Sequence, residues 1–164
     1  MSQYRIELLA KQDRKAFASG SPELDTYLRT RASQDMRRRV ASCFVAVDDT
    51  NAVAGFYTLA ATSLVLDGLS ADHARRLPRY PAIPAVLLGR LAVGLSHHGK
   101  GLGGALVADA LLRAARSEVM AYAMVVDAKD EPAARFYEHL GFERLGDDWR
   151  RLIRSLGTGL DNLT

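Results

Sequence analysis

The chain has 164 residues, which is enough for one domain around one hydrophobic core. Apolar residues make up 48% and charged residues 25%, a globular balance that excludes a disordered or low-complexity chain. The formal net charge is only +3, so any attraction for nucleic acid must come from clustered basic residues.

Several classes of protein are disfavoured by what the sequence lacks. No apolar run is long enough to cross a membrane, and residues 1–11 lack the apolar core of a signal peptide. The single Cys43 cannot form an internal disulfide and is interpreted as a small core residue. The four His residues show no metal-ligand spacing, so no metal is expected. We therefore expect a cytoplasmic protein without membrane contact.

The first half of the chain predicts three strands and one helix. Residues 4–8 alternate apolar and polar side chains, which is typical of a strand. Ser21 and Pro22 are a good N-cap and a good first helical residue. Strands are predicted over 41–47 and 53–61, joined by a polar turn, which favours an antiparallel hairpin. The buried face of the predicted helix carries Leu24, Tyr27, Leu28, Ala32 and Met36.

The second half predicts a strand over 85–93, a helix over 105–116 and a strand over 119–126. A short helix is expected over 72–77 before them, and prolines follow it. A further helix opens at Asp130 and ends at Gly141, and strands over 142–145 and 149–153 complete the chain. This order predicts an α+β (α/β) fold, with a mixed sheet and helices on both faces.

A glycine-rich stretch, Val93–Gly104, joins the strand over 85–93 to the next helix. Glycines let the backbone approach a ligand closely, and the helix N-terminus adds free N–H groups and the positive end of the dipole. The spacing fits neither a P-loop nor the dinucleotide-binding fingerprint. The stretch therefore predicts a phosphate-binding loop of another kind, the alternative being a simple connecting turn.

Two segments resemble the cofactor-binding motifs of GNAT-superfamily acetyltransferases. The segment 98–103 resembles their coenzyme A loop, with His98 where Gln or Arg is usual. The segment 130–142 resembles their second cofactor motif, with Asp130 where Asn is usual. The resemblance implies a single GNAT domain over residues 1–164 and acetyl-CoA as cosubstrate. The implied contacts are Leu91, Ala92, Val93, His98, Gly99, Lys100, Gly101, Leu102, Gly103, Gly104, Asp130 and Phe136.

A closer resemblance covers nearly the whole chain. Residues 17–28, 53–60 and 84–93 are similar to GNAT toxins of type II toxin–antitoxin modules, the TacT class. The resemblance implies an enzyme that acetylates the α-amino group of aminoacyl-tRNA and so stops translation. It also implies a ribbon-helix-helix antitoxin as partner, with DNA contacted only through that antitoxin. Whether the chain forms a homodimer is left open.

Acetyl transfer from a thioester needs a neutral amine, support for an oxyanion and a proton for the leaving thiolate. The ester of an aminoacyl group lowers the pKa of its α-amine, so a strong protein base is less necessary. Backbone N–H groups of Leu91–Val93 are the candidates for oxyanion support. Tyr137 stands where the resemblance places the family's general acid, and a phenol is protonated at neutral pH. The alternative role for Tyr137 is a core aromatic; His139 is expected on the surface.

Arginines are concentrated in two parts of the chain. Residues 29–39 contain five Arg and one Asp, and three more Arg lie between 75 and 79. Clustered Arg favours phosphate backbones, although charged helix residues are usually just a solvated face. For Arg90, the alternative to substrate contact is a structural ion pair. The predicted tRNA contacts are Arg37, Arg38, Arg39, Arg75, Arg76, Arg79 and Arg90.

Two other function classes stay open beside the toxin. A GNAT enzyme for a small amine or a protein N-terminus would have an acidic substrate pocket, and no acidic cluster is obvious. A binding module without chemistry would not need both Tyr137 and the glycine-rich loop. The sequence therefore favours an acetyl-CoA-dependent aminoacyl-tRNA acetyltransferase.

Overall fold

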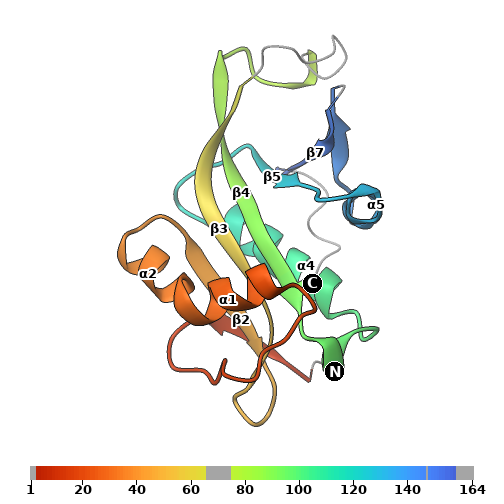
Figure 1. Cartoon of the computed structure of the whole chain (residues 1–164). Helices are drawn as coiled ribbons and strands as arrows, with labels where there is room; N and C mark the ends of the chain where they lie inside the picture. The colour runs from red at the N-terminus through yellow and green to blue at the C-terminus, as the bar shows by residue number, and fades with distance from the viewer. Residues whose placement is uncertain (1–2, 66–74, 147, 158–164) are drawn as a thin grey trace. The chain divides into compact units, whose positions relative to one another are not determined.

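The computed structural model describes residues 3–65, 75–146 and 148–157 (Figure 1). The chain divides into two compact units. Unit 1 comprises Met1–Ala60 and Gly89–Ala110, and unit 2 comprises Ala61–Leu88 and Leu111–Thr164. Of the short helix predicted over 72–77, residues 72–74 lie outside the described residues.

The described strands are hydrogen-bonded in the order β1-β2-β3-β4-β5-β7-β6. Four of the pairs, β1–β2, β2–β3, β5–β7 and β6–β7, are antiparallel, whereas β4 and β5 are parallel. The prediction of a mixed sheet is therefore confirmed, and most of these pairs are antiparallel. The strands are Arg5–Leu8 (β1), Ser42–Val47 (β2), Val53–Val65 (β3), Ala82–Val93 (β4), Ala123–Asp127 (β5), Glu143–Leu145 (β6) and Asp148–Ser155 (β7).

The helices begin where the capping residues predict. The Ser21 hydroxyl accepts the Leu24 N–H, and the Asp130 carboxylate accepts the Ala133 N–H at 2.9 Å. Gly141 follows the last helix with a φ of +91°, a conformation that glycine adopts without strain. The described helices are Pro22–Thr30 (α1), Ala32–Arg37 (α2), the 3₁₀ turn Leu95–His97 (η1), Leu102–Ala115 (α4) and Glu131–His139 (α5).

Unit 1 has helices on both faces of its strands (Figure 1). Phe56 of β3 lies in a core cluster with Tyr27 and Leu28 of α1. The preceding Gly55 points to the opposite face, where a Cβ would lie 3.0 Å from the Ala92 carbonyl oxygen and 3.1 Å from Leu106 of α4. A side chain at residue 55 would force these neighbours to move by a few tenths of an ångström, so glycine favours the close packing of α4 on the sheet.

The single helix expected up to Met36 is wrong, because the chain leaves the helix at Arg31 and forms α1 and α2. Arg14 donates hydrogen bonds to the Leu28 carbonyl at 3.0 Å and to the Ser33 hydroxyl at 2.9 Å. It thereby competes for a carbonyl that a continuous helix would use one turn later. The predicted apolar face survives this break. Tyr27, Leu28 and Ala32 are buried, and Leu24 and Met36 pack against them.

Unit 2 corrects the predicted start of β5. Val119 and Met120 are 81% and 78% exposed, and the strand begins only at Ala123. The Ser117 hydroxyl accepts the Val119 N–H at 3.2 Å, which holds this segment as a turn. The core of unit 2 is a separate cluster of residues from β3, β4, β5, β6 and β7, and includes Leu64, Val125 and Ile153.

Cys43 is confirmed as a core residue, since it is 1% exposed within the unit 1 cluster. Burial raises the pKa of its thiol to about 12, so the reactive thiolate is disfavoured.

Of the described helices, none has the length and apolar character that crossing a membrane requires. Among those same residues, His, Cys, Asp and Glu form no group suited to hold a metal ion.

Candidate active site

The glycine-rich loop in unit 1 has open space in front of two of its glycines. Gly99 and Gly101 both have a φ of +77°, and a Cβ at either position would meet nothing within 4 Å. A residue other than glycine would be strained in this conformation, and its side chain would occupy the space in front of the loop. The loop therefore offers its backbone directly to a ligand.

The N-terminus of α4 continues the loop and supplies hydrogen-bond donors. The amides of Leu102, Gly103 and Gly104 lie in the first helical turn, which has no earlier helical carbonyl to bind. The Ala105 N–H donates to the Gly101 carbonyl at 3.1 Å and is the first to enter the helical pattern. No acidic residue lies in this turn, so the positive end of the dipole is not neutralised. This arrangement fits a pyrophosphate group.

His98 secures the loop to the end of β4. Its Nε2 lies 2.9 Å from the Val93 carbonyl oxygen, so this nitrogen must carry the hydrogen and donate it. The side chain therefore positions the loop. Lys100 is exposed beside Gly101 and lines a cavity of about 520 Å³ with Tyr4 and Ile6 of the N-terminal segment.

The backbone predicted to support the oxyanion lies at the end of β4. The β4–β5 pairing runs from Ala85–Ala123 to Leu88–Val126, and Leu91, Ala92 and Val93 lie beyond its last pair. Ala92 is buried, and its two neighbours are half-buried. This segment is contiguous in sequence with the glycine-rich loop.

Tyr137 of α5, in unit 2, combines a buried ring with an accessible hydroxyl. The ring makes edge-on contacts with Phe136 and Phe142, with centroids 5.2 and 5.5 Å away. Burial raises the pKa of Tyr137 to about 12, so the phenol keeps its proton at neutral pH. Among the described residues its hydroxyl has no hydrogen-bond partner, and no buried side-chain oxygen there is left unpaired. The hydroxyl therefore reaches solvent and is free to donate.

Asp130 caps α5, as its position at the predicted start of this helix indicated. Its carboxylate oxygen Oδ1 caps α5 by accepting the Ala133 N–H. The side chain is exposed, and its second oxygen remains for other contacts. Asp130 therefore fixes the start of the helix that carries Phe136 and Tyr137.

Arg37, Arg38 and Arg39 form an exposed basic group at the end of α2. Among the described residues none of the three forms an ion pair, so their positive charges remain available. Arg39 has a φ of +61°, in the left-handed region that non-glycine residues rarely adopt. Arg39 therefore lies in the turn that joins α2 to β2.

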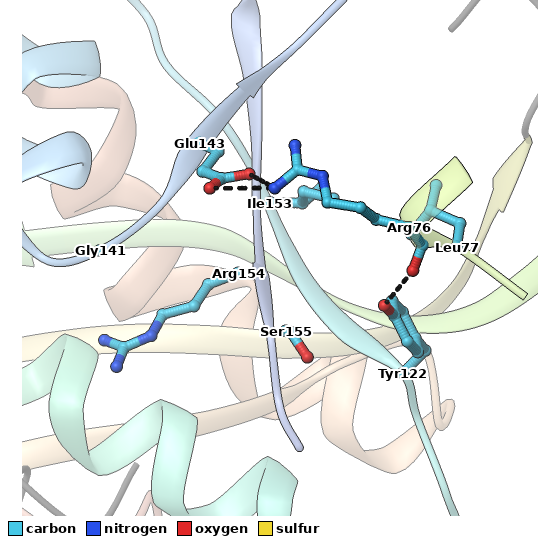
Figure 2. Close-up of a pocket in the computed structure, with 8 residues that line it drawn as sticks. All are labelled: Arg76, Leu77, Tyr122, Gly141, Glu143, Ile153, Arg154 and Ser155. Atoms are coloured by element: carbon cyan, nitrogen blue, oxygen red, sulfur yellow. Dashed lines mark hydrogen bonds and ion pairs between the residues drawn. The ribbon is translucent and has the colours of Figure 1, made fainter. Parts of the chain in front are cut away.

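The second predicted basic group consists of Arg75, Arg76 and Arg79, and the side chain of Arg76 is ion-paired. Arg76 lines a cavity of about 480 Å³ in unit 2, where Figure 2 shows it extending toward Glu143. Its guanidinium lies 3.2 Å from a Glu143 carboxylate oxygen, and the Tyr122 hydroxyl donates to the Arg76 carbonyl at 3.2 Å. Arg75 and Arg79 are exposed. Part of the charge in this group is therefore neutralised within unit 2.

Arg90 of β4 lies against an aromatic ring. Its guanidinium carbon is 3.7 Å from the centroid of Tyr27, whose hydroxyl donates to Asp35 at 2.8 Å. Among the described residues Arg90 has no ion pair, so the structural alternative finds no support there. Sequence reasoning placed Tyr27 in the core and missed this contact. No local pattern signalled it, because Arg90 and Tyr27 lie far apart in the sequence.

Comparison with known proteins places these features in context. Residues 39–144 match the family described as "Acetyltransferase (GNAT) domain". A protein of Mycobacterium tuberculosis (strain ATCC 25618 / H37Rv) named "tRNA-acetylating toxin" is 38% identical over 133 residues, covering 80% of this chain and 78% of that protein.

Two solved structures resemble the chain closely. One is described as AtaT complexed with acetyl-methionyl-tRNAfMet, with a TM-score of 0.85, 30% identity and 93% and 94% coverage of the two chains. The other is a tyrosine-to-phenylalanine mutant of the AtaT toxin bound to the C-terminus of the antitoxin AtaR and acetyl-CoA. Its TM-score is 0.79, with 28% identity and 94% coverage of each chain.

Proposed function

The chain belongs to the GNAT acetyltransferase family, and on that basis we propose that it transfers acetyl from acetyl-CoA to the α-amino group of aminoacyl-tRNA. The modified amine cannot accept a growing peptide, so the product blocks translation. The observation that carries the choice of acceptor is the exposed and unpaired group of Arg37, Arg38 and Arg39. It supplies clustered charge for phosphates in a chain similar to a tRNA-acetylating toxin.

In this proposal the glycine-rich loop holds the pyrophosphate of acetyl-CoA. The open backbone at Gly99 and Gly101 admits the anion, and the first-turn amides of α4 donate hydrogen bonds to it. Lys100 adds a positive charge beside the loop, and His98 keeps the loop tied to Val93. Acetyl-CoA supplies the thioester, and the chain supplies its binding and orientation.

The chemistry then requires two kinds of donor. Backbone N–H groups of Leu91, Ala92 and Val93 are proposed to bind the carbonyl oxygen as negative charge develops on it. Tyr137 is proposed to give its proton to the leaving thiolate, because its buried ring and raised pKa keep the phenol protonated. The aminoacyl α-amine has a low pKa from its ester, so it attacks without a strong protein base.

The surroundings of Arg90 disfavour the alternative of a small amine substrate. The cavity beside Arg90 is also lined by Arg31 and Glu23, so positive side chains outnumber negative ones. A free polyamine would be repelled there, whereas a polyanion carrying one neutral amine would be attracted.

We also propose a ribbon-helix-helix antitoxin as the protein partner, with DNA contacted through it. The similarity to AtaT bound to the C-terminus of the antitoxin AtaR supports this.

A tRNA substrate would place the reaction in the cytoplasm. Residues 1–164 would act as one catalytic domain, since β3 and β4 each continue from one unit into the other.

Replacing Arg37, Arg38 and Arg39 together with Glu tests the tRNA contact. We expect weaker tRNA binding and a salt dependence (the slope of log affinity against log salt) reduced by about three, one unit for each lost phosphate contact. Acetyl-CoA binding should not change. The measurement is a titration with charged tRNA at several salt concentrations, with acetyl-CoA affinity measured by calorimetry.

A matched control carries the same change of charge elsewhere. Lys11, Lys15 and Arg116 are exposed, and their triple replacement by Glu alters the net charge equally. An equal loss of tRNA affinity in this control would assign the effect to overall charge. An unchanged salt slope in the Arg37–Arg39 variant would remove these residues from the interface.

A further inference from the structure

A cavity of about 470 Å³ in unit 1 is lined by residues of α1 and by Arg31 and Arg90. Its apolar wall is formed by Pro22, Leu24 and the ring of Tyr27. Glu23 is the one carboxylate among the lining residues, against two guanidinium groups. The cavity therefore suits a group that has both an anionic and an apolar part.

Arg90 is held in this cavity by a stack of side chains. Phe56 in the core lies parallel to Tyr27, with ring centroids 6.2 Å apart and planes inclined by 18°. The Arg90 guanidinium carbon lies 3.7 Å from the Tyr27 centroid. This order places a buried ring beneath Tyr27 and a cation against it, an arrangement that a ring quadrupole favours.

Tyr27 itself is fixed at its other end. Its hydroxyl donates to Asp35 of α2 at 2.8 Å, and the residue is 5% exposed. Burial, and then the hydrogen bond to Asp35, raise the pKa of Tyr27, so the phenol remains a donor at neutral pH. Asp35 and Phe56 therefore hold the ring that supports Arg90.

The N–H donors of the Arg90 guanidinium are not used within the described part of the chain. Within the described part of the chain it makes no ion pair or hydrogen bond, and no side-chain nitrogen there is buried without a partner. Its N–H groups are therefore open to the cavity. A guanidinium in a fixed plane with free N–H groups is suited to bind a phosphate through two parallel hydrogen bonds.

The position of Arg90 along β4 relates this cavity to the reaction. Arg90 directly precedes Leu91–Val93, the backbone proposed to support the oxyanion, and the four residues span about 10 Å of strand. Ala92 belongs to the same core cluster as Tyr27, and side chains two residues apart share a face. Arg90 therefore faces the α1 side of this segment.

We propose that Arg90 binds the 5′-phosphate of the terminal nucleotide of the aminoacyl-tRNA, and that Tyr27 and Asp35 position it. The inference rests on the proposed function. The reacting amine is esterified to the ribose of that nucleotide, so its 5′-phosphate is the closest anion on the substrate. Binding this phosphate fixes the ester end of the substrate relative to the backbone of Leu91–Val93.

Two small substrates that differ only in this phosphate test the proposal. They are an adenosine carrying an aminoacyl ester at its 3′-oxygen, and the same compound with a 5′-phosphate. Arg90→Gln should raise KM for the phosphorylated substrate by about 10- to 100-fold, as expected for a lost charge-assisted hydrogen bond. KM for the unphosphorylated substrate and kcat for both should change less than about twofold.

Companion variants separate positioning from folding. Arg90→Lys keeps the charge without the planar fork and should raise KM by an intermediate factor. Tyr27→Phe removes only the bond to Asp35, so it should raise KM for the phosphorylated substrate alone. Arg5→Gln, on β1, is the matched control and should leave both KM values unchanged. Thermal unfolding and acetyl-CoA affinity show whether each variant is folded.

The outcomes separate this inference from the proposed function. If Arg90→Gln raised KM equally for both small substrates, the assignment of the phosphate to Arg90 would be overturned, whereas the proposed function would stand. Failure of the unchanged protein on charged tRNA would overturn the function itself. If the unchanged protein acetylates only full-length charged tRNA, the salt dependence of tRNA binding tests the inference instead. Arg90→Gln should then reduce the slope of log affinity against log salt by about one, and an unchanged slope would overturn the inference.

Discussion

Replacing Tyr137 with Phe is expected to lower the rate of acetyl transfer by about 10²- to 10⁴-fold, the usual contribution of a positioned general acid. The change removes only the hydroxyl, so the edge-on contacts of the ring with Phe136 and Phe142 remain. Acetyl-CoA affinity and thermal stability should therefore be retained. Single-turnover acetylation of charged tRNA, with enzyme in excess, measures the chemical step directly.

A second tyrosine provides the control for this experiment. The Tyr122 hydroxyl donates to the Arg76 carbonyl in unit 2, and Tyr122→Phe removes a hydroxyl of the same kind without touching the proposed chemistry. Its single-turnover rate should equal that of the unchanged protein. An unchanged rate in Tyr137→Phe would reduce Tyr137 to a packing residue of α5.

Replacing Gly101 with Glu should weaken acetyl-CoA binding by at least about 100-fold, since juxtaposed like charges cost several kcal/mol. The open position in front of Gly101 is where the proposal places the pyrophosphate, and the new side chain would enter it. The loss should appear in calorimetry as a higher Kd and in transfer assays as an absence of product.

Strain must be separated from charge in this loop, because Gly101 has a φ of +77°. Gly101→Asn places a neutral residue that tolerates this conformation and should bind acetyl-CoA more tightly than the Glu variant. Gly146 has a φ of +64° in the turn after β6, and Gly146→Glu combines strain and charge outside the loop. Undiminished acetyl-CoA affinity in Gly101→Glu would remove the glycine-rich loop from the proposed site.

Local signals in the sequence were sufficient to predict most of the fold. Ser21 and Asp130 are caps whose hydrogen bonds involve residues three positions away, so their helices could be located directly. Two cofactor motifs, each preceded by an apolar run, indicated the family, and the order of strands and helices indicated the mixed sheet; both predictions are confirmed. The acetyltransferase activity followed from the same motifs.

The errors and omissions involve partners that are distant in sequence. The break between α1 and α2 depends on Arg14, which approaches from the preceding segment. The neutralisation of Arg76 depends on Glu143, 67 residues further along the chain. Arg90 and Tyr27 meet only because β4 and α1 share a core cluster. A charge or apolar pattern in one segment does not reveal such contacts.

The most direct measurement follows labelled acetyl from acetyl-CoA into a mixture of charged tRNA, uncharged tRNA, polyamines and peptides. After nuclease digestion, the acetyl group should be found on the α-amine of aminoacyl-adenosine and be absent from the uncharged tRNA. The amount should rise with the amount of charged tRNA supplied. Label confined to polyamines or peptide N-termini would contradict the proposed substrate and assign the chain to the broader activity of its family.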